Sequence, residues 1–348
     1  MMAKIVFVFL VGVHALIHLA GFLKAFGLAE LRELSQPISK TMGTLWLLGS
    51  LLFLLFAAMY LIKNSYWWGV GLLAVLVSQL LIIQSWPEAK YGTIVNVIVL
   101  LVAVVGFSEW SFERAFQRTA KENRIASRPA LSVGSVTSQD LVHLPAPVKR
   151  YLQYAGVVGK PKIKNVGIRF NGQMRGREQD WFDFTSEQYN CFEKPSRLFF
   201  MKGVVKGLPT TAYHKYNVTT AFMKVKILSM LPVVDIEGDE LFKTETVTYF
   251  NDLCLFAPAA LIDKNIHWEQ LDDQTAKATF TNQGISISAV LHFNEEGQLI
   301  NFVSDDRKEI NEHKYLRFST PVRKYKNFNG YQLPSYGEAI WHYPEGTF

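Results

Sequence analysis

The chain has 348 residues, of which 49% are hydrophobic, and a formal net charge of +6. That length allows about two domains of roughly 100–200 residues each. Residues 1–108 hold six Lys or Arg and three acids, which leaves 30 and 27 for the rest. The charge is therefore not clustered as in proteins that bind nucleic acid. Cys191 and Cys254 are too few for a disulfide framework, and one bridge or two buried thiols both remain open.

Four apolar segments occupy the first third of the chain, at residues 5–23, 44–62, 67–83 and 93–107. Each approaches the roughly 20 helical residues that cross a hydrocarbon layer. Aromatic residues stand at several of their ends, as is typical of membrane interfaces: Tyr60, Trp67, Trp86, Tyr91 and Trp110. The sequence therefore predicts a multi-pass, four-helix transmembrane domain over residues 1–110, with membrane lipids as its neighbours.

Basic residues in the connections predict the orientation of these helices. Seven lie on the side of the N-terminus, namely Lys4, Lys63, Arg114, Arg118, Lys121, Arg124 and Arg128. Four lie on the other side, namely Lys24, Arg32, Lys40 and Lys90. Because Lys and Arg are enriched in cytoplasmic loops, we expect the C-terminal domain on the cytoplasmic side.

Four polar residues interrupt the apolar segments. His14 and His18 are four residues apart and so share one helix face, while Gln79 and Asn96 lie well inside the third and fourth segments. Polar groups are costly in hydrocarbon and usually face the interior of a bundle. One interpretation is a site for a metal, a proton or a polar head group. The other is hydrogen bonding between helices that serves only packing.

Residues 111–137 connect the membrane segments to the rest of the chain. Phe112 and Phe116 fall on one helical face with Arg118 beside it, which predicts an amphipathic, basic helix along the head groups. The polar stretch that follows, around Pro129, is typical of a flexible linker.

Residues 138–348 form the predicted soluble β domain, and from Lys162 onward the hydrophobic period is mainly 2, as in half-buried strands. Strands are predicted at 166–174, 181–192, 197–205, 211–218, 223–227, 267–271, 275–281, 285–293, 299–305, 315–326 and 335–343. Residues 239–261 have instead a helical pattern, interrupted at Pro258. The predicted fold is multi-domain α + β: the helical bundle, then an antiparallel, half-barrel-like β domain with a helical insertion.

The strongest polar cluster in the β domain is Asp305-Asp306-Arg307, at the end of a strand. Alternation along the strand would place Asp305 and Arg307 on one face. If Arg307 points into a cavity with Asp305 or Glu338, it can hold an anionic head group through a bidentate contact. The alternative is a structural salt bridge at the rim of the sheet.

Other candidate residues have more ordinary interpretations. Trp268, between His267 and Glu269, is expected to point inward, as core or as the wall of a ligand site. Asp252 is interpreted as a residue at a helix end. The chain contains neither His-Glu-x-x-His nor Gly-x-Ser-x-Gly. No catalytic residue, metal site or cofactor is therefore predicted.

Several stretches of the β domain resemble an uncharacterised bacterial family of membrane-anchored proteins, a domain of unknown function. They are Leu144–Leu152 (LPAPVKRYL), Phe256–Leu261 (FAPAAL), Trp268–Asp273 (WEQLDD), Phe293–Gly297 (FNEEG) and Asp306-Arg307. This resemblance implies no reaction and no catalytic residues. The strand count and the covering helix are also loosely similar to the half-barrels of LolA-like lipoprotein carriers, which implies a concave sheet that holds acyl chains.

These features predict a membrane-anchored binding protein whose β domain holds a lipid or other apolar ligand close to the bilayer. Its many aromatic residues suit a concave apolar cavity, although ordinary core packing would also use them. One alternative is an enzyme that acts on a membrane-associated substrate through Asp305, Arg307 and perhaps Glu338. Another is transport or sensing through His14 and His18.

Overall fold

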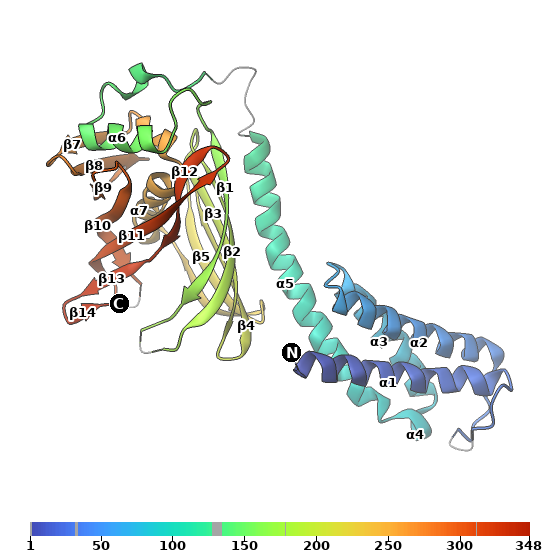
Figure 1. Ribbon diagram of the computed structural model, residues 1–348. Helices are drawn as coiled ribbons and strands as arrows, with labels where there is room; N and C mark the ends of the chain where they lie inside the picture. The colour runs from blue at the N-terminus through green and yellow to red at the C-terminus, as the bar shows by residue number, and fades with distance from the viewer. Residues whose placement is uncertain (1, 32–33, 127–133, 178, 311) are drawn as a thin grey trace. The chain divides into compact units, whose positions relative to one another are not determined.

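The computed structural model describes residues 2–31, 34–126, 134–177, 179–310 and 312–348. It contains two compact units, one of residues up to Arg114 with Leu228–Met230 and one of Ala115–Ile227 with Leu231–Phe348. The first is helical and the second consists mainly of strands (Figure 1). Arg32 and Arg128 of the predicted orientation, and Pro129 of the predicted linker, lie outside the described residues.

Four helices of the chain are long and apolar enough to cross a membrane, as predicted. They are α1 (Met2–Ala25), α2 (Lys40–Leu61), α3 (Trp67–Gln84) and α5 (Gly92–Ala126), with the one-turn α4 (Trp86–Ala89) before α5. Phe53 and Phe56 are fully buried at the centre of the bundle. Gly21 permits close packing, because a Cβ atom there would lie 2.4 Å from the ring of Trp46.

Helix α5 runs for 35 residues, and its C-terminal turns belong to the second unit. There Phe116 and Ala120 are buried. The ring of Phe116 stacks on Phe200 with centroids 5.4 Å apart and meets Tyr213 edge-on at 5.6 Å. The apolar face that we expected along the lipid head groups is therefore covered by a sheet, because complementary aromatic side chains face it.

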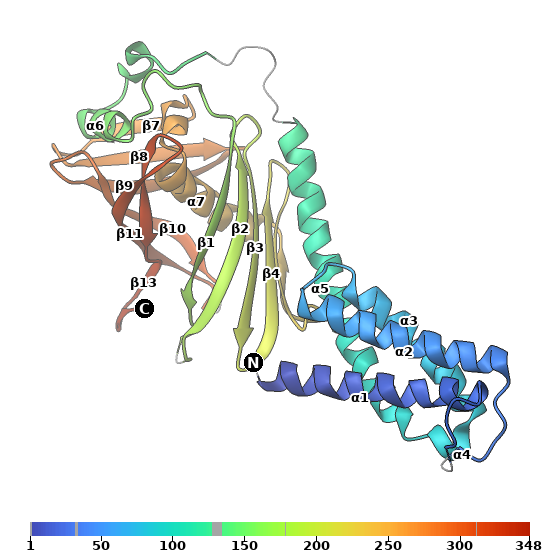
Figure 2. The same cartoon turned by 45° about the vertical axis from the view of Figure 1, so that its right-hand side comes forward.

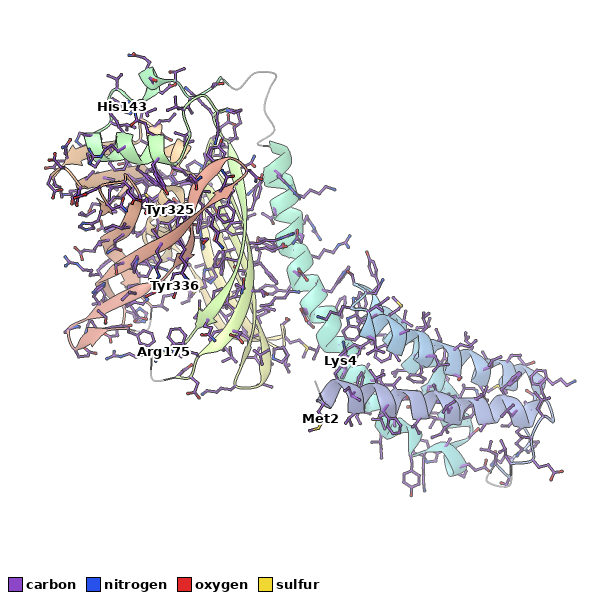
Figure 3. The ribbon with its side chains drawn as sticks, in the orientation of Figure 1. Met2, Lys4, His143, Arg175, Tyr325 and Tyr336 are labelled. Carbon is purple, nitrogen blue, oxygen red and sulfur yellow. The ribbon has the colours of Figure 1, made fainter. Side chains whose placement is uncertain are left out.

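The first sheet is a six-stranded antiparallel meander (Figure 2). Its strands are β1 (Asn165–Met174), β2 (Phe182–Cys191), β3 (Ser196–Val205), β4 (Leu208–Tyr216), β5 (Ala221–Ile227) and β6 (Leu231–Glu237). The β1–β2, β3–β4 and β5–β6 turns all lie at one end. We call the half of the sheet next to these three turns the distal half. Figure 3 shows Arg175 in the first of these turns, where its guanidinium lies over the rings of Trp181 and Phe348.

The second sheet has eight strands, in the order β14-β13-β11-β10-β9-β8-β7, with β12 paired to β11. They are β7 (Ile266–Gln270), β8 (Thr275–Asn282), β9 (Ile285–Phe293), β10 (Leu299–Glu309), β11 (Lys314–Phe328), β12 (Tyr331–Gly337), β13 (Ile340–Tyr343) and β14 (Gly346–Thr347). Neither sheet closes into a barrel within the described residues.

Helix α7 (Asp239–Phe256) lies between the two sheets (Figure 1). The short η2 (Pro258–Ile262) follows it, which confirms the predicted break at Pro258. The turn η1 (Ser138–Leu141) and helix α6 (Ala146–Tyr154) precede the strands. The main core forms where α6 and α7 meet the second sheet, around the fully buried Tyr151, Phe250, Phe293 and Phe302.

The predicted fold class is confirmed: apolar helices, then antiparallel sheets with a helical insertion. Several details differ. The two-residue β14 was not predicted. Strand β6 was not predicted either, because Pro232 stands near its start and all of its residues are exposed or half-buried. The single strand predicted at 335–343 consists of parts of β12 and β13, because the chain leaves the ladder after Gly337.

Candidate functional site

Trp268 lies on β7 and packs against the main core. Its indole Nε1 donates a hydrogen bond to the carbonyl of Leu261 at 3.4 Å. A buried indole usually finds such an acceptor. The position of Trp268 therefore agrees with its interpretation as a core residue.

A β-bulge separates the residues that we expected to act together. The pairing of β10 with β11 shifts between Ser304 and Arg307, so one extra residue enters β10 there. Because an extra residue reverses the alternation of faces, Arg307 lies on the same face as Ser304, opposite to Asp305. The sheet therefore does not bring Asp305 and Arg307 together.

The predicted acidic partners of Arg307 are engaged elsewhere. Asp305 pairs with Arg317 at 2.9 Å, and Glu338 pairs with Arg323 at 2.7 Å. Both are exposed ion pairs of the kind that contributes little to stability. Neither carboxylate contacts Arg307 among the described residues.

Arg307 is half-buried and surrounded by aromatic rings. Its guanidinium lies 4.0 Å from the ring centroid of Phe318 and 5.2 Å from that of Trp341. Its Nε atom is buried, without a hydrogen-bond partner in the described part of the chain. Burial lowers the pKa of Arg307 to about 10, although the carboxylate of Glu245 opposes that shift.

A second arginine forms the centre of a buried ionic cluster that the sequence did not indicate. Arg197, on β3, donates from Nε to Asp252 at 2.7 Å and from one terminal nitrogen to Glu245 at 3.3 Å. Both carboxylates project from α7, seven residues and thus about two turns apart. All three side chains are buried. The cluster therefore fixes one face of α7 to the six-stranded sheet.

Neutral side chains of β2 complete this ionic cluster. Gln188 and Asn190 donate to Asp252 at 2.6 and 3.2 Å, and Gln188 also accepts from Arg197 at 3.3 Å. His214 of β4 lies 3.5 Å from Glu245. Hydrogen bonds of this kind offset the cost of removing charges from water.

The two carboxyl groups of the cluster have pKa values shifted in opposite directions. Burial raises the pKa of Asp252, and this outweighs the effect of Arg197. Burial would also raise the pKa of Glu245, but the hydrogen bond from His214 and the charge of Arg197 lower it to about 2. Glu245 is therefore the firmly ionised partner of Arg197, and Asp252 is the group that takes up a proton more readily.

The distal half of the six-stranded sheet carries a separate apolar cluster on the face of Arg197. Because Arg197, Phe199 and Met201 alternate along β3, they share that face. Phe199, Met201 and Ala212 are buried together, with Phe182, Phe184 and Val225 packed against them. Phe170 of β1 lies beside Phe184 and Phe199 yet remains 37% exposed. This surface is distinct from the main core and is partly accessible.

The polar residues of the four candidate membrane spans form one hydrogen-bonded network. His14 Nε2 lies 3.1 Å from Asn96 Oδ1, and His18 Nε2 lies 2.8 Å from the hydroxyl of Ser78. Asn96 also donates to Gln79 at 3.0 Å. The two histidines, Asn96 and Ser78 are all buried. The bundle therefore brings the four predicted residues together and adds Ser78, whose hydroxyl gave no signal in an apolar segment.

No group of three or more His, Cys, Asp or Glu side chains in the described residues could hold a metal ion. Cys191 and Cys254 are both buried, and neither forms a disulfide in the part of the chain that the structure describes. The chemistry that these groups offer is hydrogen bonding and charge.

Residues 134–348 match the family model of DUF6544, a family of unknown function. The chain belongs to this family. No curated protein matches the chain, and no solved structure matches it. The resemblance to an uncharacterised family is therefore confirmed, whereas the similarity to LolA-like half-barrels stays a prediction.

The DUF6544 match contains both sheets and α7, hence the Arg197 cluster, Arg307 and the distal apolar surface. It does not contain the helices that carry His14 and His18. The candidate sites of the β unit thus lie within the family segment, and the hydrogen-bonded network of the helical unit lies outside it.

Proposed function

We propose that this DUF6544 protein is a membrane-anchored binding protein whose β unit takes an amphiphile with an anionic head group. The apolar chain would lie on the distal half of the six-stranded sheet, and Arg307 would contact the head group. The observation that carries this proposal is an accessible apolar surface, separate from the main core, in a unit where the buried Nε atom of Arg307 has no hydrogen-bond partner among the described residues.

The apolar part of the site is argued from the distal surface. A core residue is normally covered on all sides, but Phe170 and Met174 stay 37% and 41% exposed on the face that carries Phe199. A contiguous exposed apolar surface usually marks a binding site. Rings that already contact one another, such as Phe170 and Phe184, provide a rigid surface for an alkyl chain.

The polar part of the site is argued from charge. Arg197 is bonded to both carboxylates of α7. Arg307 has rings on its faces instead and a free Nε atom. A carboxylate or phosphate matches a guanidinium, and such charge-assisted hydrogen bonds are the strong ones. Asp252 is close enough for its charge to act on Arg307. Because the pKa of Asp252 is raised, this carboxyl group can take up a proton when the anionic head group of the ligand binds.

The location supports a lipid-like ligand. Four helices that can cross a membrane precede the β unit in the same chain. Membrane amphiphiles are therefore the abundant apolar molecules around it. By the loop charges, we propose that the β unit lies on the cytoplasmic side.

The test is displacement of cis-parinaric acid, a fluorescent fatty acid, from the full-length protein in detergent. Palmitate is expected to displace the probe, and hexadecanol, with the same chain and no charge, to do so at least about tenfold more weakly. Arg307→Gln should weaken palmitate binding by about tenfold or more, since hydrogen bonds to charged groups contribute roughly 1.5–3 kcal/mol.

Arg317→Gln is the matched control, because Arg317 lies on the neighbouring strand in an exposed pair with Asp305. It should leave palmitate binding unchanged. Equal displacement by palmitate and hexadecanol, or equal effects of the two substitutions, would contradict the assignment of Arg307. Absence of any probe binding would overturn the proposed function.

A further inference from the structure

The helical unit contains a cavity of about 370 Å³ among α1, α2, α3 and the start of α5. It lies at the end of the bundle where α1 finishes and α4 begins. Ile17, Trp46, Ile82 and Val95 contribute apolar walls. The volume falls within the range of small-molecule sites, which are mostly apolar with a few convergent polar groups.

His14 and His18 supply polar groups to this cavity. The ring of His18 is fixed on two sides: its Nδ1 donates to the carbonyl of His14 at 3.0 Å, and Trp46 packs 5.1 Å from it. All described hydrogen-bond partners of the two imidazoles are neutral groups. Because an unpaired charge is costly at membrane depth, both rings are uncharged donors and acceptors.

Glu88 is the one charged residue that lines the cavity among those described. Its Oε1 accepts from the backbone nitrogens of Ser35 and Gln36 at 2.8 and 3.2 Å, and from the Ser35 hydroxyl. These bonds hold the connection between α1 and α2 next to the cavity, where Leu34 forms part of the wall. Lys24 is bonded to the carbonyl of Leu34.

These charges decide the class of ligand. A phosphate or carboxylate head would face the carboxylate of Glu88 and find no Lys or Arg among the described lining residues. A cationic head would have to compete with Lys24, whose charge already acts on Glu88, and with the three hydrogen bonds made to Glu88 Oε1. The N–H group of each neutral imidazole already donates, from His14 Nε2 to Asn96 Oδ1 and from His18 Nδ1 to the carbonyl of His14. A hydroxyl, by contrast, can donate to His14 Nδ1, which has no partner among the described residues.

We propose that this cavity is a second binding site, for a membrane-dissolved amphiphile whose head is an uncharged hydroxyl. The hydroxyl would donate a hydrogen bond to His14 Nδ1, and the first part of the tail would lie against Trp46 and Ile82. This site is independent of the proposed anionic site in the β unit and has the opposite head-group preference.

The test uses the full-length protein in phosphatidylcholine nanodiscs and a diazirine derivative of farnesol. Photolabelled peptides are expected to contain residues of the cavity wall, such as Trp46 or Val95. Unlabelled farnesol, which offers a hydroxyl, is the expected competitor, and decylubiquinone, whose carbonyls can only accept hydrogen bonds, is the neutral control. Farnesol should suppress labelling about tenfold better than either decylubiquinone or farnesyl phosphate.

Ala20→Phe should abolish labelling by filling the cavity, and Leu34→Trp should do so from the connection without changing a spanning helix. Leu16→Phe is the control, because Leu16 lies on α1 but is 63% exposed. His14→Phe, which keeps a ring but removes its nitrogens, should weaken labelling about tenfold.

Labelling spread over exposed positions such as Leu16 and unaffected by either filling substitution would overturn the proposal. So would equal competition by farnesyl phosphate or by decylubiquinone. If the wild type shows cavity labelling but binds no palmitate, the proposed function of the β unit is contradicted and the cavity site is not.

Discussion

Arg197 is buried where an unpaired charge would be energetically costly. Its partners come from two other elements of the β unit. The cation meets Asp252 and Glu245 from α7 and Gln188 from β2 while itself belonging to β3. Removing one member of such a cluster leaves an uncompensated buried charge. The residue therefore has a structural role that can be separated from the ligand role proposed for Arg307.

Arg197→Leu is expected to lower the free energy of unfolding by about 3–5 kcal/mol, because two buried carboxylates then lose their cation. Arg317→Leu removes only an exposed partner of Asp305 and should change the free energy of unfolding by less than about 1 kcal/mol. Urea unfolding of the full-length protein in detergent, followed by near-ultraviolet circular dichroism, measures both. Similar losses for the two variants would contradict the assignment.

Glu245 predicts a pH dependence. A carboxyl group whose pKa is lower in the folded than in the unfolded state stabilises the fold above its unfolded pKa, here about 4.5, and loses that effect as the pH falls toward about 2. The lowering corresponds to stabilisation on the order of 3 kcal/mol at neutral pH.

The thermal midpoint of the wild type should therefore exceed that of Glu245→Gln at pH 6, and the gap should narrow toward pH 3. The comparison with the variant is needed because the raised pKa of Asp252 contributes with the opposite sign. If the difference in thermal midpoint between wild type and Glu245→Gln stays constant with pH, the variant is destabilised by altered packing and not by loss of the ionised carboxylate.

Helix α5 contributes to two folded units at once. Its N-terminal part is apolar enough to cross a membrane, whereas Phe116 and Ala120 are buried in the β unit. The amphipathic pattern correctly indicated one apolar face beyond the span. The pattern could not show whether lipid or the β-sheet covers this face, because either would bury the same side chains.

Phe116→Ala is expected to cost about 3–5 kcal/mol of packing in the β unit, as for other buried aromatic truncations. Hydrogen exchange in β3 and β4 should rise, since Phe200 and Tyr213 lose the ring between them. Leu101→Ala, at a position 61% exposed on the same helix, is the control and should leave those strands unchanged. Unaltered exchange in Phe116→Ala would show that this contact does not stabilise the sheet.

Regular elements were predictable from the sequence because their signals are local. Alternation located most strands, and hydrophobic length located the four spans. The Arg307 site depended instead on a one-residue bulge in β10 that no residue pattern marks. The spacing of Glu245 and Asp252 could have placed them on one face of α7. Their partner Arg197, however, is 48 and 55 residues away, and its position follows from which sheet covers that helix.

Considered as a whole, the molecule combines four candidate membrane spans with a DUF6544 segment. An even number of spans would put both ends of the chain on one side of the bilayer. From the loop charges we propose that this side is the cytoplasm.

Single cysteines at Ser65 and Lys90 test this topology, because both positions are exposed and lie in connections at opposite ends of the bundle. An impermeant maleimide on intact cells should label Lys90→Cys and not Ser65→Cys. The native Cys191 and Cys254 are buried and should not react. Reversed labelling would place the β unit outside the cytoplasm, and labelling of both would exclude a spanning arrangement.

The contact of Phe116 with the sheet also determines where a fragment that contains the β unit should begin. The family match begins at residue 134, which makes that residue an obvious start for a soluble fragment. Such a fragment would lack Phe116 and leave Phe200 and Tyr213 as a bare apolar strip, so it should self-associate. A fragment from Ala115 would keep the strip covered. The family match therefore begins at residue 134, whereas the folding unit begins at Ala115. A fragment for biochemical work on the β unit should begin at Ala115.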